Sequence, residues 1–191
     1  MKVWLGCWRE AAGALAVPAV IRIGFELWDR GGLGWGTAAE ITTVWAVVGV
    51  VWATAAWLSL RHRARTSGIT LTPDALTGRQ TRQLRVPRPS VGWSDRMRTE
   101  LKTSDRASVA AEKGSEEIWF HWRPGLRRHT VWGSITFDEP SGTVLVDLRE
   151  GSVYTGVSGV RRGASFVALC QVARGLGVVE TESRRKAGVQ A

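Results

Sequence analysis

Cysteine is scarce in this 191-residue chain, and charge is scarce in its first third. The only cysteines are Cys7 and Cys170, so a disulfide framework is not expected and the main domain is assigned to a reducing compartment. Six residues precede Cys7, which is too short for the apolar core of a cleavable or lipoprotein signal. These shortages exclude a secreted, disulfide-stapled fold.

The charge distribution divides the chain near residue 60. Of 26 Lys and Arg and 17 Asp and Glu, four of each fall in residues 1–60, which leaves 22 against 13 for residues 61–191. The net charge of +9 therefore belongs to the second part. A basic domain is drawn to anionic lipid or to nucleic acid, although arginine can also serve only as a solubilising residue.

Two segments of the first part have the length and composition of membrane helices. Residues 38–60, AAEITTVWAVVGVVWATAAWLSL, carry one charge and reach roughly 34 Å at 1.5 Å per residue, enough for a hydrocarbon core of about 30 Å. Residues 11–28 form a weaker span, because they contain a proline and two charges; the alternative is an amphipathic helix lying on the membrane. We therefore predict that residues 1–65 form a two-helix transmembrane hairpin.

Antiparallel packing of these spans has two consequences for their side chains. Four charges should meet at the outer interface and neutralise one another: Arg22, Glu26, Asp29 and Glu40. Small residues should give the second span a smooth face for close helix packing or dimerisation: Ala46, Gly49, Ala53 and Ala56.

Cations flanking the spans predict their orientation. Basic residues beside a membrane helix tend to stay in the cytoplasm, and here they precede the first span and follow the second: Lys2, Arg9, Arg61, Arg63 and Arg65. We therefore expect a multi-pass protein of the inner cell membrane with both termini in the cytoplasm.

The remainder reads as a β-rich cytoplasmic domain over residues 66–182, with a tail at 183–191 that we expect to be disordered. β-Branched and aromatic residues between turn signals predict short strands, about seven in all, and the clearest fall at 69–72, 83–87, 117–122, 129–137, 143–150 and 153–157. A charged insertion at 93–117 has no sustained apolar stripe and is expected to be a long loop or short helix. Helical spacing of apolar residues predicts a closing helix at 164–177. The fold class is thus α+β, with a small barrel or sandwich closed by a C-terminal helix.

This order of elements resembles bacterial membrane proteins in which two N-terminal spans precede a pleckstrin-homology-like domain. The resemblance rests on ITLTPDALTG as an opening hairpin, VPRPSVGWSD as the strand leading into a variable insertion, and FVALCQVARGLG as the closing helix. It implies binding to lipid head groups or partner proteins, and no catalysis. The insertion at 93–117 departs from a compact version of such a domain.

The sequence predicts no catalytic residues, no cofactor and no metal site. His121, His129 and Cys170 make at most an incomplete ligand set, with no ligand-motif spacing. The run GVSGV at 156–160 lacks the last glycine of a nucleophile elbow. We therefore do not expect an enzyme.

Basic clusters are the remaining candidates for a site that binds lipid or a partner. They comprise the juxtamembrane collar, a predicted hairpin tip and a turn: Arg61, Arg63, Arg65, Arg123, Arg127, Arg128, Arg161 and Arg162. Each cluster can equally be a solvated turn, and the collar can be no more than a topology signal.

Three functions compete on this evidence. The first is a membrane-anchored binding or scaffolding module that contacts anionic lipid, a partner protein or a second copy. The second is an accessory subunit of a membrane transport or cell-envelope enzyme complex, with the hairpin as the interaction surface. Nucleic-acid binding ranks last, because the tryptophans available for stacking are as readily core residues: Trp93, Trp119, Trp122 and Trp132.

Overall fold

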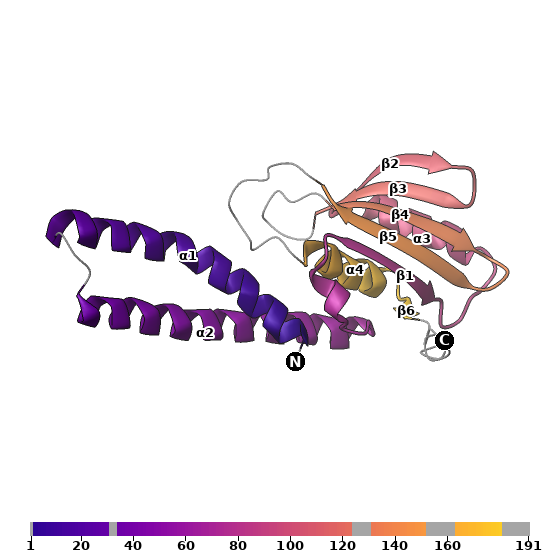
Figure 1. Cartoon of the computed structure of the whole chain (residues 1–191). Coiled ribbons are helices and arrows are strands. Elements are labelled where there is room, and N and C mark those ends of the chain that lie inside the picture. Colours follow the sequence, from indigo (N-terminus) through magenta and orange to yellow (C-terminus); the bar gives the residue numbers. More distant parts are fainter. Residues whose placement is uncertain (1, 31–33, 124–130, 152–162, 181–191) are drawn as a thin grey trace, which may run out of the picture. The chain divides into compact units, whose positions relative to one another are not determined.

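The computed structural model of the chain describes residues 2–30, 34–123, 131–151 and 163–180 (Figure 1). These residues form two compact units that divide after Arg61. The first is a pair of long helices, and the second is a sheet with helices packed on it. The protein is therefore an α+β protein with two long apolar helices at its N-terminus.

The first unit contains α1 (Lys2–Arg30) and most of α2 (Trp35–Ser67), which run antiparallel (Figure 1). The helix α1 begins nine residues before the predicted span, because the residues ahead of that span are also apolar enough to stay helical. The helix α2 ends at Ser67 and is followed by Gly68, whose φ of 68° is open to glycine and strained for other residues. There the Ile69 N–H donates to the Ala64 carbonyl at 3.0 Å, in a Schellman-type cap.

The second unit is built on one six-stranded antiparallel sheet with the strand order β2-β3-β4-β5-β1-β6. Consecutive strands β2 to β5 form a meander, and β1 pairs beside β5. In chain order, the elements are η1 (Pro73–Leu76), β1 (Arg79–Arg85), α3 (Trp93–Thr103), β2 (Ala107–Lys113), β3 (Glu117–Trp122), β4 (Val131–Asp138), β5 (Thr143–Glu150), α4 (Ala164–Gly175) and β6 (Val179–Glu180).

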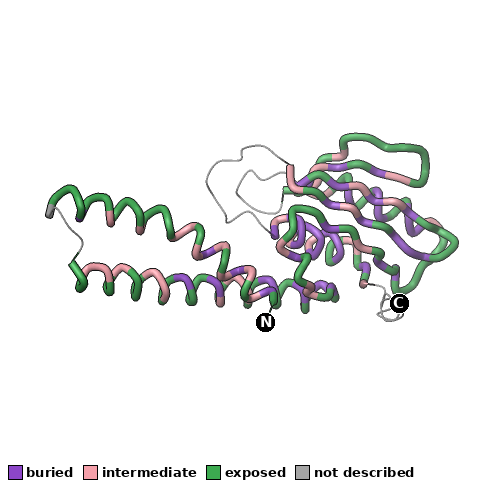
Figure 2. Tube along the Cα trace, viewed as in Figure 1, coloured by how far each residue is buried: buried purple, intermediate pink, exposed green. Residues whose placement is uncertain are grey.

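Both α3 and α4 pack on the same face of this sheet. The Trp93 ring of α3 contacts Phe137 of β4, and the Trp122 indole N–H of β3 donates to Gln171 of α4 at 2.9 Å. Alternate strand residues supply the sheet side of this core, and Phe166 of α4 is fully buried. Figure 2 shows the buried positions concentrated on the strands and α4, while exposed positions dominate most of the hairpin.

Gly133 of β4 makes room in this core for the side chains around it. A Cβ atom at this position would lie 2.6 Å from Leu148 Cδ2 and 2.6 Å from Phe120 Cζ. Real Cβ atoms do not approach that closely, so the neighbouring rings and methyl groups occupy the space of the missing side chain. Glycine is therefore required here for packing.

Several expectations about this unit are corrected by the structure. The described strands form a single open sheet with two helices on one face, and not a barrel or a sandwich of two sheets. Residues 69–72 are not a strand, because the Thr70 N–H donates to the Glu180 carboxylate at 2.6 Å and not to a neighbouring strand. The predicted strand at 153–157 and the tail at 183–191 lie outside the described residues.

The charged insertion at 93–117 begins with a short helix, one of the two alternatives expected for it, and is not a long loop. It contains α3 and β2, and it leads into β3. In α3, Trp93, Met97 and Leu101 recur at every fourth position and are buried against the sheet. This narrow apolar stripe is enough to hold α3 against the sheet, although all the remaining residues of the helix are polar.

The two edges of the sheet are protected in different ways. At one edge, β6 is only two residues long. At the other, β2 is seven residues long and mostly exposed, but its register shifts between Val109 and Ala111 as in a β-bulge. Lys102 of α3 forms an ion pair with Glu112 of β2, with Nζ and Oε1 2.6 Å apart.

Candidate functional site

The helices of the hairpin contact each other closely at one end. The Trp8 and Trp45 rings meet edge to face, with centroids 5.9 Å apart, and the Trp4 indole N–H donates to Thr54 Oγ1 at 3.3 Å. Gly49 faces Leu15 and Trp8 across this contact. The predicted small-residue face is therefore turned toward α1: Gly49 and Ala53 are buried, and Ala46 and Ala56 are half-buried.

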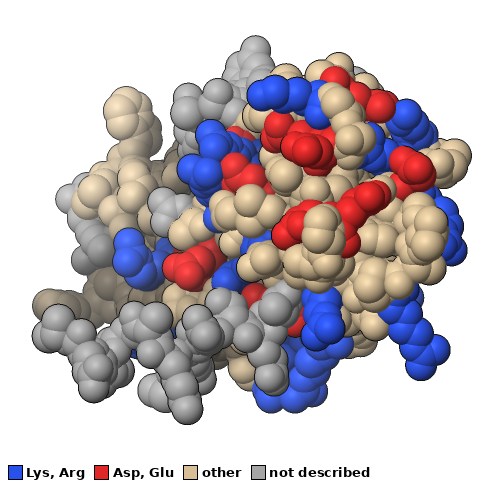
Figure 3. All heavy atoms as spheres, turned by 90° about the vertical axis from the view of Figure 1, so that its right-hand side faces the viewer, with Lys and Arg blue, Asp and Glu red and all other residues tan. Residues whose placement is uncertain are grey.

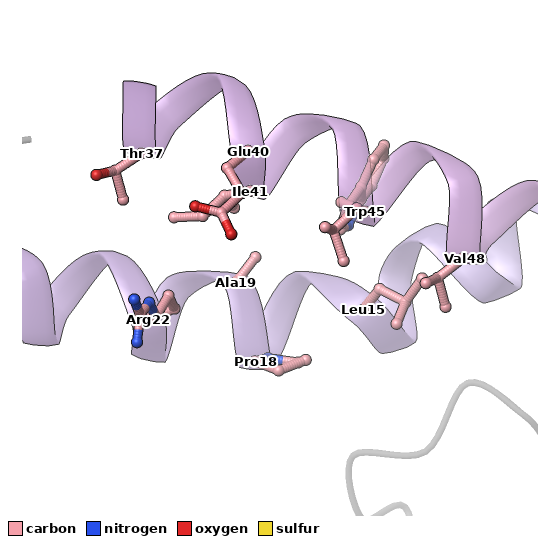
Figure 4. A pocket seen from close by; sticks show the side chains of 10 residues that line it. Leu15, Pro18, Ala19, Arg22, Thr37, Glu40, Ile41, Trp45 and Val48 are labelled. Atoms are coloured by element: carbon pink, nitrogen blue, oxygen red, sulfur yellow. The ribbon is translucent and has the colours of Figure 1, made fainter. Parts of the chain in front are cut away.

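Toward the connecting loop, the facing sides of α1 and α2 are separated by a cavity of about 290 Å³ (Figure 4). The residues that line it recur every three or four positions on each helix, so they belong to the two inner faces. Most are apolar, and Thr37, Arg22 and Glu40 make the end nearest the loop polar. The lining is Leu15, Pro18, Ala19 and Arg22 from α1, with Thr37, Glu40, Ile41, Val44, Trp45 and Val48 from α2.

Three of the four charges predicted to meet do gather at this polar end. The Arg22 guanidinium lies 2.9 Å from the carboxylate of Glu26, whose side chain is 8% exposed. Glu40 lines the same cavity as Arg22, and Figure 4 shows its carboxylate extending from α2 into the gap between the helices. Asp29 is exposed on α1 and does not line the cavity.

The arginines predicted to bind lipid fall into two groups. Arg61, Arg63 and Arg65 are exposed on the last turns of α2, where the Arg61 guanidinium lies 5.1 Å from the centre of the Trp57 ring. Arg123 is exposed just after β3. The other four lie outside the described residues: Arg127, Arg128, Arg161 and Arg162.

Charge of both signs is interspersed on one end of the molecule. On the face turned to the viewer in Figure 3, Asp and Glu side chains lie among Lys and Arg side chains. That face therefore presents no broad surface of a single sign. The collar of Arg61, Arg63 and Arg65 is the clearest exposed run of one sign among the described residues.

On the second face of the sheet, no helix lies among the described residues, and aromatic rings are exposed. Trp119 of β3 and Trp132 of β4 are each about half exposed, at 46% and 48%. They are diagonal neighbours, because Trp132 pairs with His121 and Trp119 pairs with Ser134 in the ladder. The His121 and Trp132 rings lie 3.7 Å apart between centroids. We call this surface the open sheet face.

A hydrogen-bonded carboxylate lies beside these rings on the open sheet face. Asp147 accepts from Arg79 at 3.0 and 3.1 Å, from Thr81 at 2.8 Å and from Arg149 at 3.1 Å. Burial alone would raise the pKa of Asp147, but these hydrogen bonds outweigh it and hold the pKa below its ordinary value. The open sheet face thus combines aromatic rings with arginines whose charge is partly neutralised.

The residues considered for a metal site are not brought together. His121 points to the open sheet face, whereas Cys170 is buried in α4 on the opposite side of the sheet. Burial raises the pKa of the Cys170 thiol, opposed by a hydrogen bond with Ser67 and by the charge of Arg63. No cluster of three or more metal-ligating side chains occurs among the described residues, and both His129 and GVSGV at 156–160 lie outside them.

Sequence reasoning missed the open sheet face as a candidate surface. The signal was present in EIWFHW at 117–122, where Trp119 interrupts the alternation of apolar and polar residues expected of a strand with one solvated face. Ile118, Phe120 and Trp122 face the helices, so the intervening Trp119 and His121 must face the other way. Trp93 and Trp122 are core residues, and only Trp119 and Trp132 of the four tryptophans considered for stacking are exposed.

Both long helices pass a test of length and composition for membrane spans, as Lys2–Asp29 and Trp35–Ser67. Comparison with known proteins adds no further assignment: no family model matches the chain, and no curated protein or solved structure matches it either. The function is therefore inferred from the geometry of the hairpin and of the sheet.

Proposed function

We propose that the chain is an integral membrane protein whose N-terminal hairpin anchors a basic binding module at the cytoplasmic side of the inner membrane. The observation that carries this proposal is the burial of the long helices. In the 18-residue apolar stretch of each, only 11% of the residues are buried. A core helix of a water-soluble domain buries most of such a stretch, whereas a membrane helix presents it to lipid.

The lengths and flanking charges support the same proposal. With 28 and 33 residues, the candidate spans reach roughly 42 and 50 Å, beyond the hydrocarbon core of about 30 Å. Antiparallel helices put Lys2 and Arg9 at the same end as the collar of Arg61, Arg63 and Arg65. Cations gathered at one end favour the cytoplasm for that end. Trp57, beneath Arg61, suits the boundary between lipid and water.

Two surfaces support binding as the role of the anchored domain. The collar offers three exposed cations to anionic lipid, each contributing about 1 kcal/mol near such a leaflet. The open sheet face, with Trp119 and Trp132, has the aromatic and arginine composition that protein interfaces favour. The pleckstrin-homology-like resemblance supports the same role, although the single open sheet departs from a closed barrel.

Membrane integration is tested by alkaline carbonate extraction of membranes that contain the full chain. We expect the protein to stay in the pellet, and trypsin to reach the collar only from the cytoplasmic side, in inverted vesicles. Release into the supernatant, or cleavage of the collar in intact spheroplasts, contradicts the anchor or its orientation.

The lipid contact of the collar is tested by counting the anionic lipids that the full chain retains. Replacing Arg61, Arg63 and Arg65 by Gln should lower retention of phosphatidylglycerol about fivefold per arginine. The matched control replaces three exposed arginines of the sheet domain by Gln, namely Arg88, Arg96 and Arg106. Equal loss in both triple variants assigns the binding to net charge and removes the collar as a site.

An accessory subunit of a membrane enzyme or transport complex is the second candidate, and the open sheet face favours it. Exposed tryptophans on a helix-free sheet face are typical of a surface that a partner covers. Purification in mild detergent should then recover a stoichiometric partner with the native chain and lose it on Trp119→Ser and Trp132→Ser. Recovery of lipid alone, with no protein, contradicts this candidate.

A further inference from the structure

The cavity between α1 and α2 is bounded by the faces that two packed helices would normally press together. Near Trp8 these faces are in contact, but from Leu15 toward the loop a cavity of about 290 Å³ lies between them. This volume lies just below the range of about 300–1,000 Å³ found for ligand pockets, so it holds part of a lipid and not the whole molecule. Atoms that line an unfilled space lose their dispersion contacts, so an occupant stabilises the hairpin.

The apolar part of the lining matches a hydrocarbon chain. Leu15 and Pro18 of α1 line this part together with Val44 and Val48 of α2. Figure 4 shows Leu15 and Val48 at the end of the cavity where the helices converge. Within the anchor proposed above, on which this inference rests, the surrounding bilayer supplies acyl chains at high concentration. An apolar space between two helices in a membrane is then filled by lipid more readily than by water.

The polar end of the cavity selects among lipid headgroups. Arg22, Glu26 and Glu40 sum to one negative charge, which disfavours a headgroup with a net negative charge. A zwitterionic headgroup complements them, with its phosphate toward Arg22 and its ammonium toward Glu40. A choline ammonium has no N–H to donate and is held by cages of aromatic rings, whereas the lining has one aromatic residue, Trp45. An ethanolamine ammonium donates hydrogen bonds that a carboxylate accepts.

We propose that the hairpin cavity binds one phosphatidylethanolamine molecule, with an acyl chain between Leu15, Pro18, Val44 and Val48 and its headgroup between Arg22 and Glu40. The lipid completes the packing of α1 on α2 in the part of the hairpin where the cavity separates their facing sides. This site differs from the arginine collar in position and in the net charge of the lipid it prefers, which is zero here and negative at the collar.

The test uses the full chain in vesicles with equal amounts of phosphatidylethanolamine, phosphatidylcholine and phosphatidylglycerol that carry identical acyl chains. Native mass spectrometry after mild detergent release counts the retained lipids. We expect one retained phosphatidylethanolamine, enriched about tenfold over phosphatidylcholine, as one charge-assisted hydrogen bond predicts. Glu40→Gln should abolish the enrichment, and Val44→Trp should expel the lipid by filling the cavity.

Two control variants test whether these effects are specific to the cavity. Asp29→Asn removes an exposed carboxylate of α1, and Val51→Trp adds the same ring to an exposed α2 position; neither residue lines the cavity. Both controls should retain the lipid. Retention by Val44→Trp, equal enrichment of phosphatidylglycerol, or a lipid-free dimer in which a second copy fills the space would each overturn the proposal. A protein that resists carbonate extraction yet holds no such lipid refutes this inference alone, whereas carbonate release refutes the anchor itself.

Discussion

The hairpin exposes most of its apolar side chains, whereas the sheet domain buries them. Phe25 of α1 is 68% exposed, while Phe166 of α4 is fully buried. Both units are well-formed secondary structure, so the difference lies in what covers their apolar side chains. The sheet domain covers its own, whereas the helices of the proposed anchor would present theirs to lipid.

The strongest way to sharpen this contrast is to delete the same ring from each unit. Phe166→Ala should lower the free energy of unfolding of the sheet domain by about 3–5 kcal/mol, because it opens a cavity under the strands. Phe25→Ala should change that free energy by less than about 0.5 kcal/mol, because it removes an exposed ring. Amide hydrogen exchange in β4 and β5 of the full chain in detergent measures both. Equal losses of free energy of unfolding in the two variants would contradict the difference in burial between the two units.

A second pair of substitutions adds one methyl group to a buried glycine of each unit. Gly133→Ala places a Cβ 2.6 Å from Phe120 and Leu148, and overpacking of this kind costs about 1–3 kcal/mol. At Gly49 the nearest atoms, on Leu15 and Trp8, would lie at 3.7 and 3.8 Å, which is ordinary contact. Gly49→Ala should therefore leave the hairpin intact.

The melting temperature of the sheet domain and disulfide trapping between cysteines placed on α1 and α2 report on these two variants. A tolerated Gly133→Ala would show that the strands move apart easily. A disrupted Gly49→Ala would mean that the hairpin packs more tightly than the sheet core. The larger change Gly49→Leu tests the hairpin contact, and not assembly with a partner, since Gly49 already faces α1.

The smallest expected effect belongs to the ion network on the open sheet face. Asp147→Asn should cost no more than about 1 kcal/mol at neutral pH, because Arg79 and Arg149 are more than half exposed. The pKa of Asp147 lies below its ordinary value of 3.8, so its contribution is fully present above about pH 4 and is lost as the pH falls through the lowered pKa.

Urea unfolding of the full chain between pH 2 and pH 6 checks this dependence. The native protein should have a higher free energy of unfolding than Asp147→Asn at neutral pH, and this difference should decline below pH 4. High salt should reduce the difference at neutral pH. Asp105→Asn, another exposed carboxylate, is the control. A difference in free energy of unfolding that does not decline at all as the pH falls below 4 would show that Asp147 acts through packing and not through its charge.

The elements that could be predicted from sequence are those whose pattern is local. The long apolar helix of residues 38–60, the strands at 117–122 and 143–150 and the closing helix at 164–177 all fall within α2, β3, β5 and α4 or closely match them. In each case, one run of residues carries a complete periodic signal. Such a signal does not depend on distant contacts.

The elements that were missed depend on distant partners. The two-residue strand β6 is defined by its pairing with Leu84 and Arg85, almost 100 positions earlier. The helix α3 was expected only as an alternative to a long loop, because it has three buried apolar residues and their role is visible once Phe137 is known to contact Trp93. The cavity of the hairpin could not be predicted either, because a pattern of apolar residues fixes which faces meet but not how closely.

The bulged edge of the sheet has a consequence if the proposed anchor confines the chain to a membrane. Anchored copies would share two dimensions, so their domains would meet far more often than free copies at the same cellular abundance. An unprotected strand edge would then join neighbours into ladders. The register shift between Val109 and Ala111, together with the charges of Glu112 and Lys113, interrupts the β2 edge. Crowded copies of this protein should therefore remain separate in the plane of the membrane.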